Sequence, residues 1–278
     1  MIKIGRTQTL RILRLTKDGS VLGDDDAVEV LLPRDECPKD ANEGGRVHVF
    51  VHPDKDGKPI ATTTPPKAEV GEFALMKVKA IRGAGAHMEW GIEPTLLVPH
   101  EEQRKAMEEG RWYIVHVGYD EEEDRLFGST RVEDHLDNTE LTVARGDKVD
   151  LLVFSKSELG MSVIVNHKHQ GLIHTNEIFK PVSIGDRIIG YVKTVREDNK
   201  LDITLQPIGY RQYIDGHMAL LAKRLQSGGG FLPLTDKSSA EEIYAEFGIS
   251  KKAFKKALGA LYKERVVRIE EAGIVWVG

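Results

Sequence analysis

The chain repeats one spacing of glycines and apolar residues three times. In each copy one glycine lies 28 residues, and a second lies 14 residues, before the end of a short apolar phrase. The first glycines are Gly5, Gly71 and Gly146, the second are Gly19, Gly85 and Gly160, and the phrases end at Pro33, Pro99 and His174. A glutamate follows each phrase after three residues, at Glu36, Glu102 and Glu177. A period of about 65 to 75 residues is too long for a solenoid unit and suits small domains in tandem.

Each repeat has the short runs of β-branched and aromatic residues that are typical of strands. Val47–Val51, Tyr113–Val117 and Ile188–Val192 are such runs, and turn-forming residues bound them. Four or five short strands in about 65 residues are too few for a sandwich and enough for a five-stranded Greek-key barrel, the OB-fold. We therefore predict a mainly β protein with three tandem OB-fold barrels, at residues 1–66, 67–138 and 139–210.

The remaining residues, 211–278, predict a C-terminal α+β domain of the winged-helix type. A helical pattern covers Ile214–Gln226, and Ser239 begins a capping-box match ahead of a short second helix. Ser250 is placed to cap a longer third helix, whose apolar residues recur at helical spacing. The last two apolar runs predict a hairpin, so that three helices precede a two-stranded wing.

Composition limits the class of protein and its surroundings. The 278 residues contain one cysteine, Cys37, which excludes an internal disulfide framework and a cysteine-based zinc site. No apolar run has the roughly 18 to 20 residues of a membrane span, so we expect no membrane attachment and a cytoplasmic location. The net charge is −5. It is uneven, because residues 211–278 carry 11 Lys and Arg against 8 Asp and Glu. Strong, indiscriminate nucleic-acid binding is therefore not expected, although a local basic groove is compatible with this charge.

Several segments resemble a known family of nucleic-acid-binding proteins. The third repeat resembles the S1-type RNA-binding domain over Gly171–Glu177, Gly185–Val192 and Lys200–Leu205. The second repeat over Gly85–Gln103, and the tail over Asp236–Tyr244, are similar to the conserved virulence factor B family. The resemblance extends over essentially the whole chain and is weakest in the first repeat. It implies a bacterial RNA-binding protein with three S1-like domains and a C-terminal winged helix.

The resemblance also implies which residues would contact RNA in the barrels. A typical S1 domain has two aromatic residues beside the turn glycine, a histidine that closes the apolar phrase, and a basic residue before the last strand. The third repeat keeps His174 and Lys200, has Arg196 where an acid is usual, and lacks both aromatic residues. The second repeat offers His87, Arg125 and an additional tryptophan, Trp90.

We predict that the second repeat, with His87 and Trp90, is the preferred stacking surface, because bases of a single strand stack on aromatic side chains. The first repeat is expected to be structural or weakly binding. Each assignment has an alternative that the residues leave open. Trp90 could pack in a barrel core, His174 could be hydrogen-bonded at a strand end, and Arg196 and Lys200 could be solvated turn residues.

In the tail, the predicted third helix carries a lysine face. The four lysines are Lys252, Lys255, Lys256 and Lys263. They suit phosphate contacts, while an ordinary solvated helix face is the alternative. No Asn, Gln or Arg lies mid-helix to read base edges, so sequence-specific DNA recognition by this helix alone is not expected.

These observations favour a non-enzymatic regulator of gene expression that binds single-stranded RNA as a monomer. The second hypothesis is a DNA-binding transcriptional regulator that acts through the winged helix, and the third is a protein-interaction scaffold. We predict no enzyme activity, because the acidic residues concentrate in loop runs rather than at strand ends. No metal site or cofactor is predicted, since the histidines show no paired metal-ligand spacing.

Overall fold

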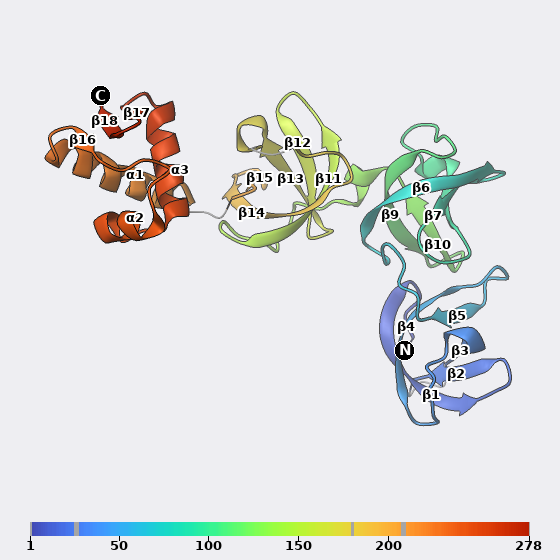
Figure 1. Ribbon diagram of the computed structural model, residues 1–278. Coiled ribbons are helices and arrows are strands. Elements are labelled where there is room, and N and C mark those ends of the chain that lie inside the picture. Colours follow the sequence, from blue (N-terminus) through green and yellow to red (C-terminus); the bar gives the residue numbers. More distant parts are fainter. Residues whose placement is uncertain (1, 25–27, 179–180, 207–209, 278) are drawn as a thin grey trace. The chain divides into compact units, whose positions relative to one another are not determined.

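The computed structural model describes residues 2–24, 28–178, 181–206 and 210–277. The chain divides into two compact units, Met1–Leu205 and Gln206–Gly278. The first unit contains three five-stranded sheets, and the second contains three helices with a small sheet (Figure 1). The predicted boundary at residue 210 adjoins residues 207–209, which lie outside the described part.

The first sheet closes into a barrel. Its strands are β1 (Arg6–Leu15), β2 (Gly19–Gly23), β3 (Glu29–Pro33), β4 (Arg46–Pro53) and β5 (Pro59–Thr62), paired in the order β1-β2-β3-β5-β4. A 3-10 helix, η1 (Arg34–Glu36), follows β3. Alternate side chains of the strands, such as Leu10, Ile12 and Leu32, fill the interior.

The second and third sheets repeat this strand arrangement, except that the strands at the two ends of the second sheet are not paired with each other; we call it the second barrel. The second has β6 (Phe73–Arg82), β7 (Gly85–Glu89), β8 (Leu96–Pro99), β9 (Trp112–Asp120) and β10 (Arg125–Ser129), in the order β10-β9-β6-β7-β8. The third closes into a barrel from β11 (Lys148–Lys156), β12 (Gly160–Val165), β13 (His169–His174), β14 (Arg187–Val195) and β15 (Leu201–Thr204). Short 3-10 helices are η2 (His100–Glu102), η3 (Val132–His135) and η4 (Thr175–Glu177). The predicted mainly β architecture of OB-type barrels is confirmed, and we number the three barrels in chain order.

The second glycine of each repeat, at Gly19, Gly85 and Gly160, has one structural cause in all three barrels. A Cβ atom on Gly160 would lie 2.0 Å from the backbone oxygen of Ile173, so only glycine lets β12 approach β13. The equivalent glycines of the first two barrels meet the same obstacle, 2.0 Å and 2.1 Å from a backbone oxygen. Glu177 accepts a hydrogen bond from the hydroxyl of Thr204, which fixes η4 to the last strand.

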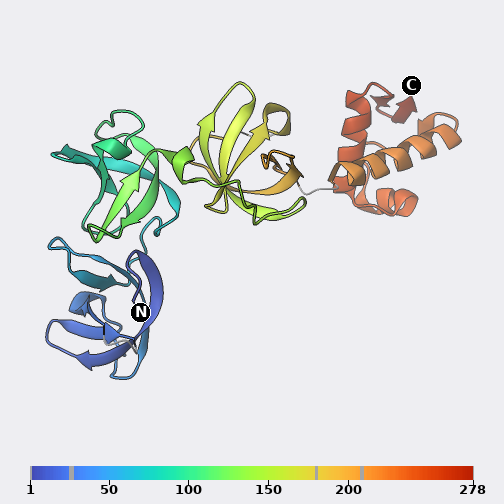
Figure 2. The same cartoon turned by 180° about the vertical axis from the view of Figure 1, so that it is seen from behind.

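The second and third barrels share an apolar core. Phe73, Ile114 and Val132 of the second barrel form one buried cluster with Leu152 and Ile164 of the third. Figure 2 shows these two barrels side by side from behind. The polar backbone at this junction is also satisfied across it: the ring Nδ1 of His167 accepts from the backbone N–H of Phe73 at 3.0 Å.

The second unit has the predicted winged-helix elements. They are α1 (Tyr210–Ser227), β16 (Phe231–Leu232), α2 (Ala240–Phe247), α3 (Lys251–Lys263), β17 (Val267–Glu270) and β18 (Gly273–Trp276). Ser239 and Glu242 form the predicted capping box, and the side chain of Ser250 accepts from Ala253 N–H at the start of α3. The short strand β16, which pairs with β18, was not predicted.

Candidate nucleic-acid interface

The third barrel has a groove on the face that OB-folds use for oligonucleotides, where the second and third strands and their loops meet. Its volume is about 440 Å³. It is lined by residues of β12, β13 and β15 and by the turn before β15, among them Ser162, Leu172, Arg196, Lys200 and Asp202. The structure therefore brings three of the predicted residues to one place, because His174 hydrogen-bonds to the same aspartate.

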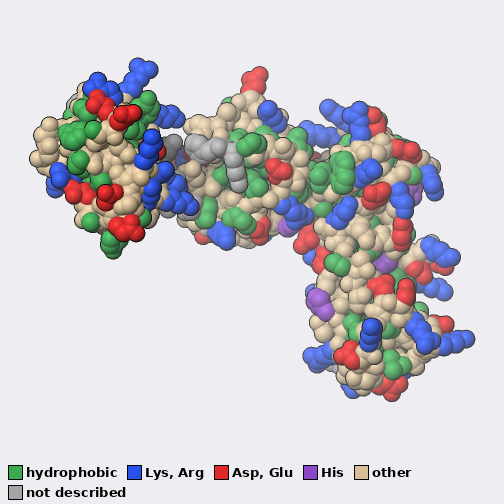
Figure 3. Space-filling view, viewed as in Figure 1, with side chains coloured by type: hydrophobic (Ala, Val, Ile, Leu, Met, Phe, Trp, Pro, Cys, Tyr) green, Lys and Arg blue, Asp and Glu red, His purple; other side chains and the backbone are tan. Residues whose placement is uncertain are grey.

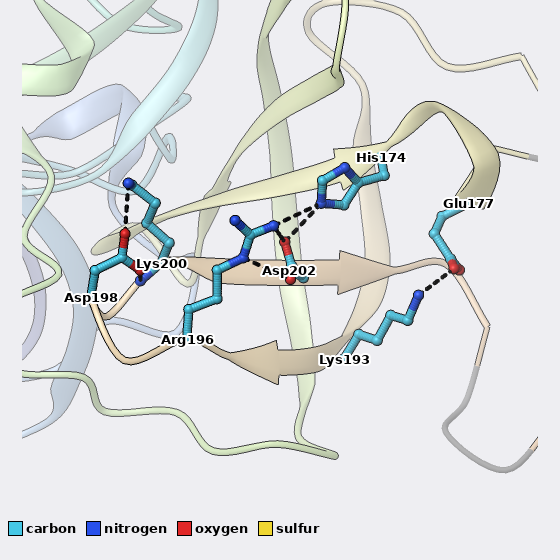
Figure 4. A network of polar contacts seen from close by, with 7 residues as sticks. All are labelled: His174, Glu177, Lys193, Arg196, Asp198, Lys200 and Asp202. Carbon is cyan, nitrogen blue, oxygen red and sulfur yellow. Dashed lines mark hydrogen bonds and ion pairs between the residues drawn. The ribbon is translucent and has the colours of Figure 1, made fainter.

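Arg196, Asp202 and His174 form the central polar network of this face (Figure 4). The guanidinium of Arg196 donates from Nε to Oδ2 of Asp202 at 3.0 Å and from Nη2 to Oδ1 at 2.7 Å. His174 Nε2 lies 2.8 Å from Oδ1. A carboxylate only accepts, so the proton on His174 resides on Nε2 and the ring is held at the end of β13.

The network sets the charge state of Asp202. Partial burial raises the pKa of Asp202, but the hydrogen bonds from Arg196 and His174 outweigh it, so this pKa lies below its ordinary value. Asp202 is consequently ionised at neutral pH, and its two hydrogen bonds fix the orientation of the Arg196 guanidinium. The Nη1 group of Arg196 has no partner among the described residues, and its two N–H donors remain for a ligand such as a phosphate.

Lys200 and Leu159 lie at the edges of the groove. Lys200 pairs with Asp198 at 2.7 Å while its side chain stays 72% exposed, so this surface pair is weak and easily exchanged for a phosphate. Leu159, at one of the positions where S1 domains carry an aromatic residue, is exposed on the turn before β12. The groove thus offers cations and apolar contact without an aromatic platform.

The prediction for Trp90 is wrong. Its side chain is 2% exposed and belongs to the core of the second barrel. The indole Nε1 donates to the backbone oxygen of Pro94 at 2.8 Å, and the ring meets Phe50 of the first barrel edge-on at 5.8 Å between centroids. A base cannot stack on this ring, because the neighbouring barrel and its linker cover it.

The other two predicted residues of the second barrel, His87 and Arg125, do not line the groove of the third barrel. His87 is half-buried on β7, and its Nδ1 lies 3.1 Å from the hydroxyl of Thr95. Arg125, at the start of β10, is exposed and pairs with Glu123 at 2.8 Å. Both remain predictions as nucleic-acid contacts.

In the second unit, α3 presents the predicted lysines to solvent. Lys252, Lys255, Lys256 and Lys263 are all exposed, while the opposite side of α3 packs into the core through Phe254 and Leu258. Lys255 lies 3.8 Å from Asp236. Figure 3 shows Lys and Arg side chains gathered over α3. Gly259 lies on the exposed side of α3, where it leaves room for close approach of a backbone.

One aromatic residue that the sequence argument passed over is open to solvent. Trp112, the first residue of β9, is 54% exposed, and the ammonium of Lys67 lies 5.3 Å from its ring centroid. In the sequence it stands in an apolar strand pattern after Gly110-Arg111, where a core position and an exposed position look alike. The one signal in the sequence is that the chain has only three tryptophans.

Residues 2–24, 28–178, 181–206 and 210–277 contain no group of three or more His, Cys, Asp or Glu side chains arranged to hold a metal ion. Within the same ranges, helices long and apolar enough to cross a bilayer are absent.

Comparison with known proteins gives two family matches. The model described as S1 domain matches residues 4–64, which is the repeat with the weakest resemblance by the residues quoted above. The model described as CvfB-like winged helix domain matches residues 219–275.

Curated proteins named Conserved virulence factor B are similar over most of the chain. The protein from Staphylococcus epidermidis is 25% identical, over 98% of this chain and 94% of its own. The protein from Staphylococcus aureus is 24% identical, over 92% and 83%. Among solved structures, a multidomain protein with nucleic acid binding domains from Streptococcus pneumoniae is 22% identical, with 99% and 98% coverage and a TM-score of 0.42.

Proposed function

We propose that this chain, a homologue of the Conserved virulence factor B proteins over most of its length, binds single-stranded RNA and regulates gene expression after transcription. Its S1 domain and winged helix are both nucleic-acid-binding types of domain, which supports nucleic acid as the partner. The groove on the third barrel carries the proposal further, because Arg196 presents two unpaired N–H donors there beside the exposed Lys200.

The choice of single strands follows from the groove. Backbone-tracking cations in a groove of an OB-fold are the usual arrangement for single-stranded nucleic acid. The cations of this face, Arg196 and Lys200, suit phosphates, and no aromatic residue lines the groove to stack on a base. We therefore expect salt-sensitive binding with modest base preference. The second unit carries its own cationic face, the exposed lysines of α3.

We propose no enzymatic activity. Catalysis of hydrolysis usually needs titratable groups that converge in a pocket or acids that hold a metal. In the third-barrel groove the one shielded carboxylate, Asp202, is neutralised by Arg196 and engaged by His174. Its lowered pKa makes it a poor general base at neutral pH.

One observation favours a second candidate function. The lysine face of α3 would suit the phosphates of duplex DNA, since the third helix of a winged helix usually enters the major groove. A transcriptional regulator of this kind should prefer a duplex. The absence of Asn, Gln or Arg within Lys251–Lys263 argues against base-specific reading, and so ranks this candidate below RNA.

Fluorescence anisotropy with labelled single-stranded RNA, single-stranded DNA and duplex DNA of equal length tests the proposal. We expect tightest binding of single-stranded RNA, weakened by Arg196→Ala and by the double change Lys255→Ala, Lys256→Ala. Arg14→Ala is the matched control, because Arg14 of the first barrel also pairs with a carboxylate, Glu29, at 2.6 Å. Preference for duplex would move the assignment to the DNA-binding regulator, and no binding at low salt would refute both.

A further inference from the structure

The outer face of β6 and β9 continues from a buried junction to open solvent. Across this antiparallel pair, Phe73 lies opposite His116, Leu75 opposite Ile114, and Lys77 opposite Trp112. Residues two apart on a strand share a face. The third barrel covers the first end of this face through the buried cluster around Phe73. It leaves the other end, with Trp112, exposed.

A cleft lies next to the part of this face that the third barrel covers. Its volume is about 410 Å³, within the range of ligand pockets. One wall is the exposed end of the second sheet, with Leu75 and Trp112, and the opposite wall comes from the third barrel, with Phe154 and Ile184. Arg104 and Lys105, in the loop after η2, also line it. The cleft is separate from the groove around Arg196, because the two share none of the residues that line them.

The surroundings of Trp112 are cationic. Lys67 lies over its ring and donates to the backbone oxygen of Glu89, while Lys77 is its cross-strand neighbour. In the described part of the chain, Lys67, Lys77 and Lys105 make no ion pair with a carboxylate. Arg104 is neutralised by Glu133, at 2.5 Å and 2.7 Å from its Nη1. An aromatic ring flanked by lysines matches a base with its neighbouring phosphates.

We propose that this cleft is a second contact for the single strand, in which one unstacked base lies on Trp112 and the lysines hold the flanking phosphates. The inference rests on the proposed function. It adds a site away from the β12 and β13 face of the third barrel, and it supplies the stacking surface that the groove around Arg196 lacks. The charge favours a nucleic acid over a protein segment, which would have to be acidic and apolar together.

The test uses the full chain and a labelled RNA of about 25 nucleotides, with Trp112→Ala, Trp112→Phe and Tyr244→Ala. Tyr244 is an exposed aromatic residue of the second unit and serves as the matched control. We expect Trp112→Ala to weaken binding about 5- to 150-fold, the value of one stacked base. Trp112→Phe should retain most of the affinity. Because Trp112 is exposed, the thermal midpoints of all variants should stay close to that of the unmodified chain.

Two further measurements separate stacking from charge. Bound RNA should quench the tryptophan fluorescence of the unmodified chain and should do so much less in Trp112→Phe, since Trp90 is buried and Trp276 packs against the core of the second unit. Lys77→Gln with Lys105→Gln should reduce the salt dependence of binding, whereas Lys39→Gln, an exposed lysine of the first barrel, should not.

The outcomes distinguish the two proposals. If the unmodified chain binds no oligonucleotide, the proposed function itself fails. If it binds RNA and Trp112→Ala binds equally well, the cleft is not a contact for the strand, and a protein partner becomes the better occupant. Reduced affinity in Trp112→Ala with unchanged Tyr244→Ala would support the site.

Discussion

Arg196, in the turn that joins β14 to β15, donates two parallel hydrogen bonds to the carboxylate of Asp202. The planar fork of a guanidinium matches a carboxylate in this geometry, so the pair fixes the direction of the arginine as well as its charge. Hydrogen bonding to Asp202 also raises the pKa of Arg196. The result is a cation that is already oriented before any ligand arrives.

Loss of this oriented cation should lower the salt dependence of RNA binding. Removing one phosphate contact reduces the slope of log affinity against log salt by about 0.7 for a single strand. We expect that change for Arg196→Ala in anisotropy titrations from low to moderate salt. Arg14→Ala should leave the slope unaltered. An equal slope in Arg196→Ala and the unmodified chain would show that Arg196 contacts no phosphate.

Truncation of Trp90 should affect stability, because its ring fills the core where the first two barrels meet. Trp90→Ala is expected to lower the free energy of unfolding by about 3 to 5 kcal/mol, the range for large aromatic residues in cores. Urea denaturation followed by circular dichroism measures this. A loss in the free energy of unfolding below about 0.5 kcal/mol would contradict the role of Trp90 as a packed core residue.

Two glycines, one in a strand and one in a helix, should respond oppositely to alanine. Gly160 has a φ of 150° and its Cβ would strike Ile173 O, so Gly160→Ala should destabilise the first unit by about 1 to 3 kcal/mol or more. Gly259 lies within α3 with nothing within 4 Å of its Cβ position. Gly259→Ala should stabilise the second unit by up to about 1 kcal/mol. Calorimetry would contradict this assignment if both changes shifted the melting transition in the same direction.

Acid should weaken the junction of the second and third barrels. His116 stacks on His135 with 3.9 Å between ring centroids, and burial, followed by the nearby His135, lowers the pKa of His116 to about 3. The unfolded chain takes up a proton near pH 6.5 and the folded chain does not, so this stability is complete above about 6.5 and is lost toward pH 3.

Thermal midpoints of the unmodified chain measured between pH 7.5 and pH 4.5 should therefore fall more steeply than those of His116→Gln, which lacks the titrating group. His48→Gln is a control, since His48 is an exposed histidine of the first barrel. Parallel curves for the unmodified chain and His116→Gln would show that His116 does not govern the acid response.

Features that depend on neighbouring residues of the chain were predictable. Gly160 and its counterparts revealed the barrels, because the close approach of two strands forbids any other residue at that point. Ser239 and Ser250 identified the starts of α2 and α3, because a cap forms between residues only three positions apart.

Exposure of the tryptophans was not predictable in the same way. Trp90 and Trp112 both stand near strand ends, yet Phe50 of the preceding barrel covers the first and nothing comparable covers the second. Whether a ring is covered depends on how one barrel packs against the next, and no local pattern encodes that. The pairing of Arg196 with Asp202 was not predictable either, because it depends on how the turn after β14 places the arginine against β15.

The backbone of Phe73, in the second barrel, is hydrogen-bonded to the third barrel. Its N–H is held by His167 and its carbonyl oxygen accepts from Arg187, both third-barrel side chains. A cut between the second and third repeats would leave this N–H and this carbonyl oxygen without their side-chain partners and would expose the ring of Phe73. The sequence contains three repeats, but recombination or domain transplantation would have to move the second and third together. The smallest segment that can be exchanged without damage is therefore two repeats long.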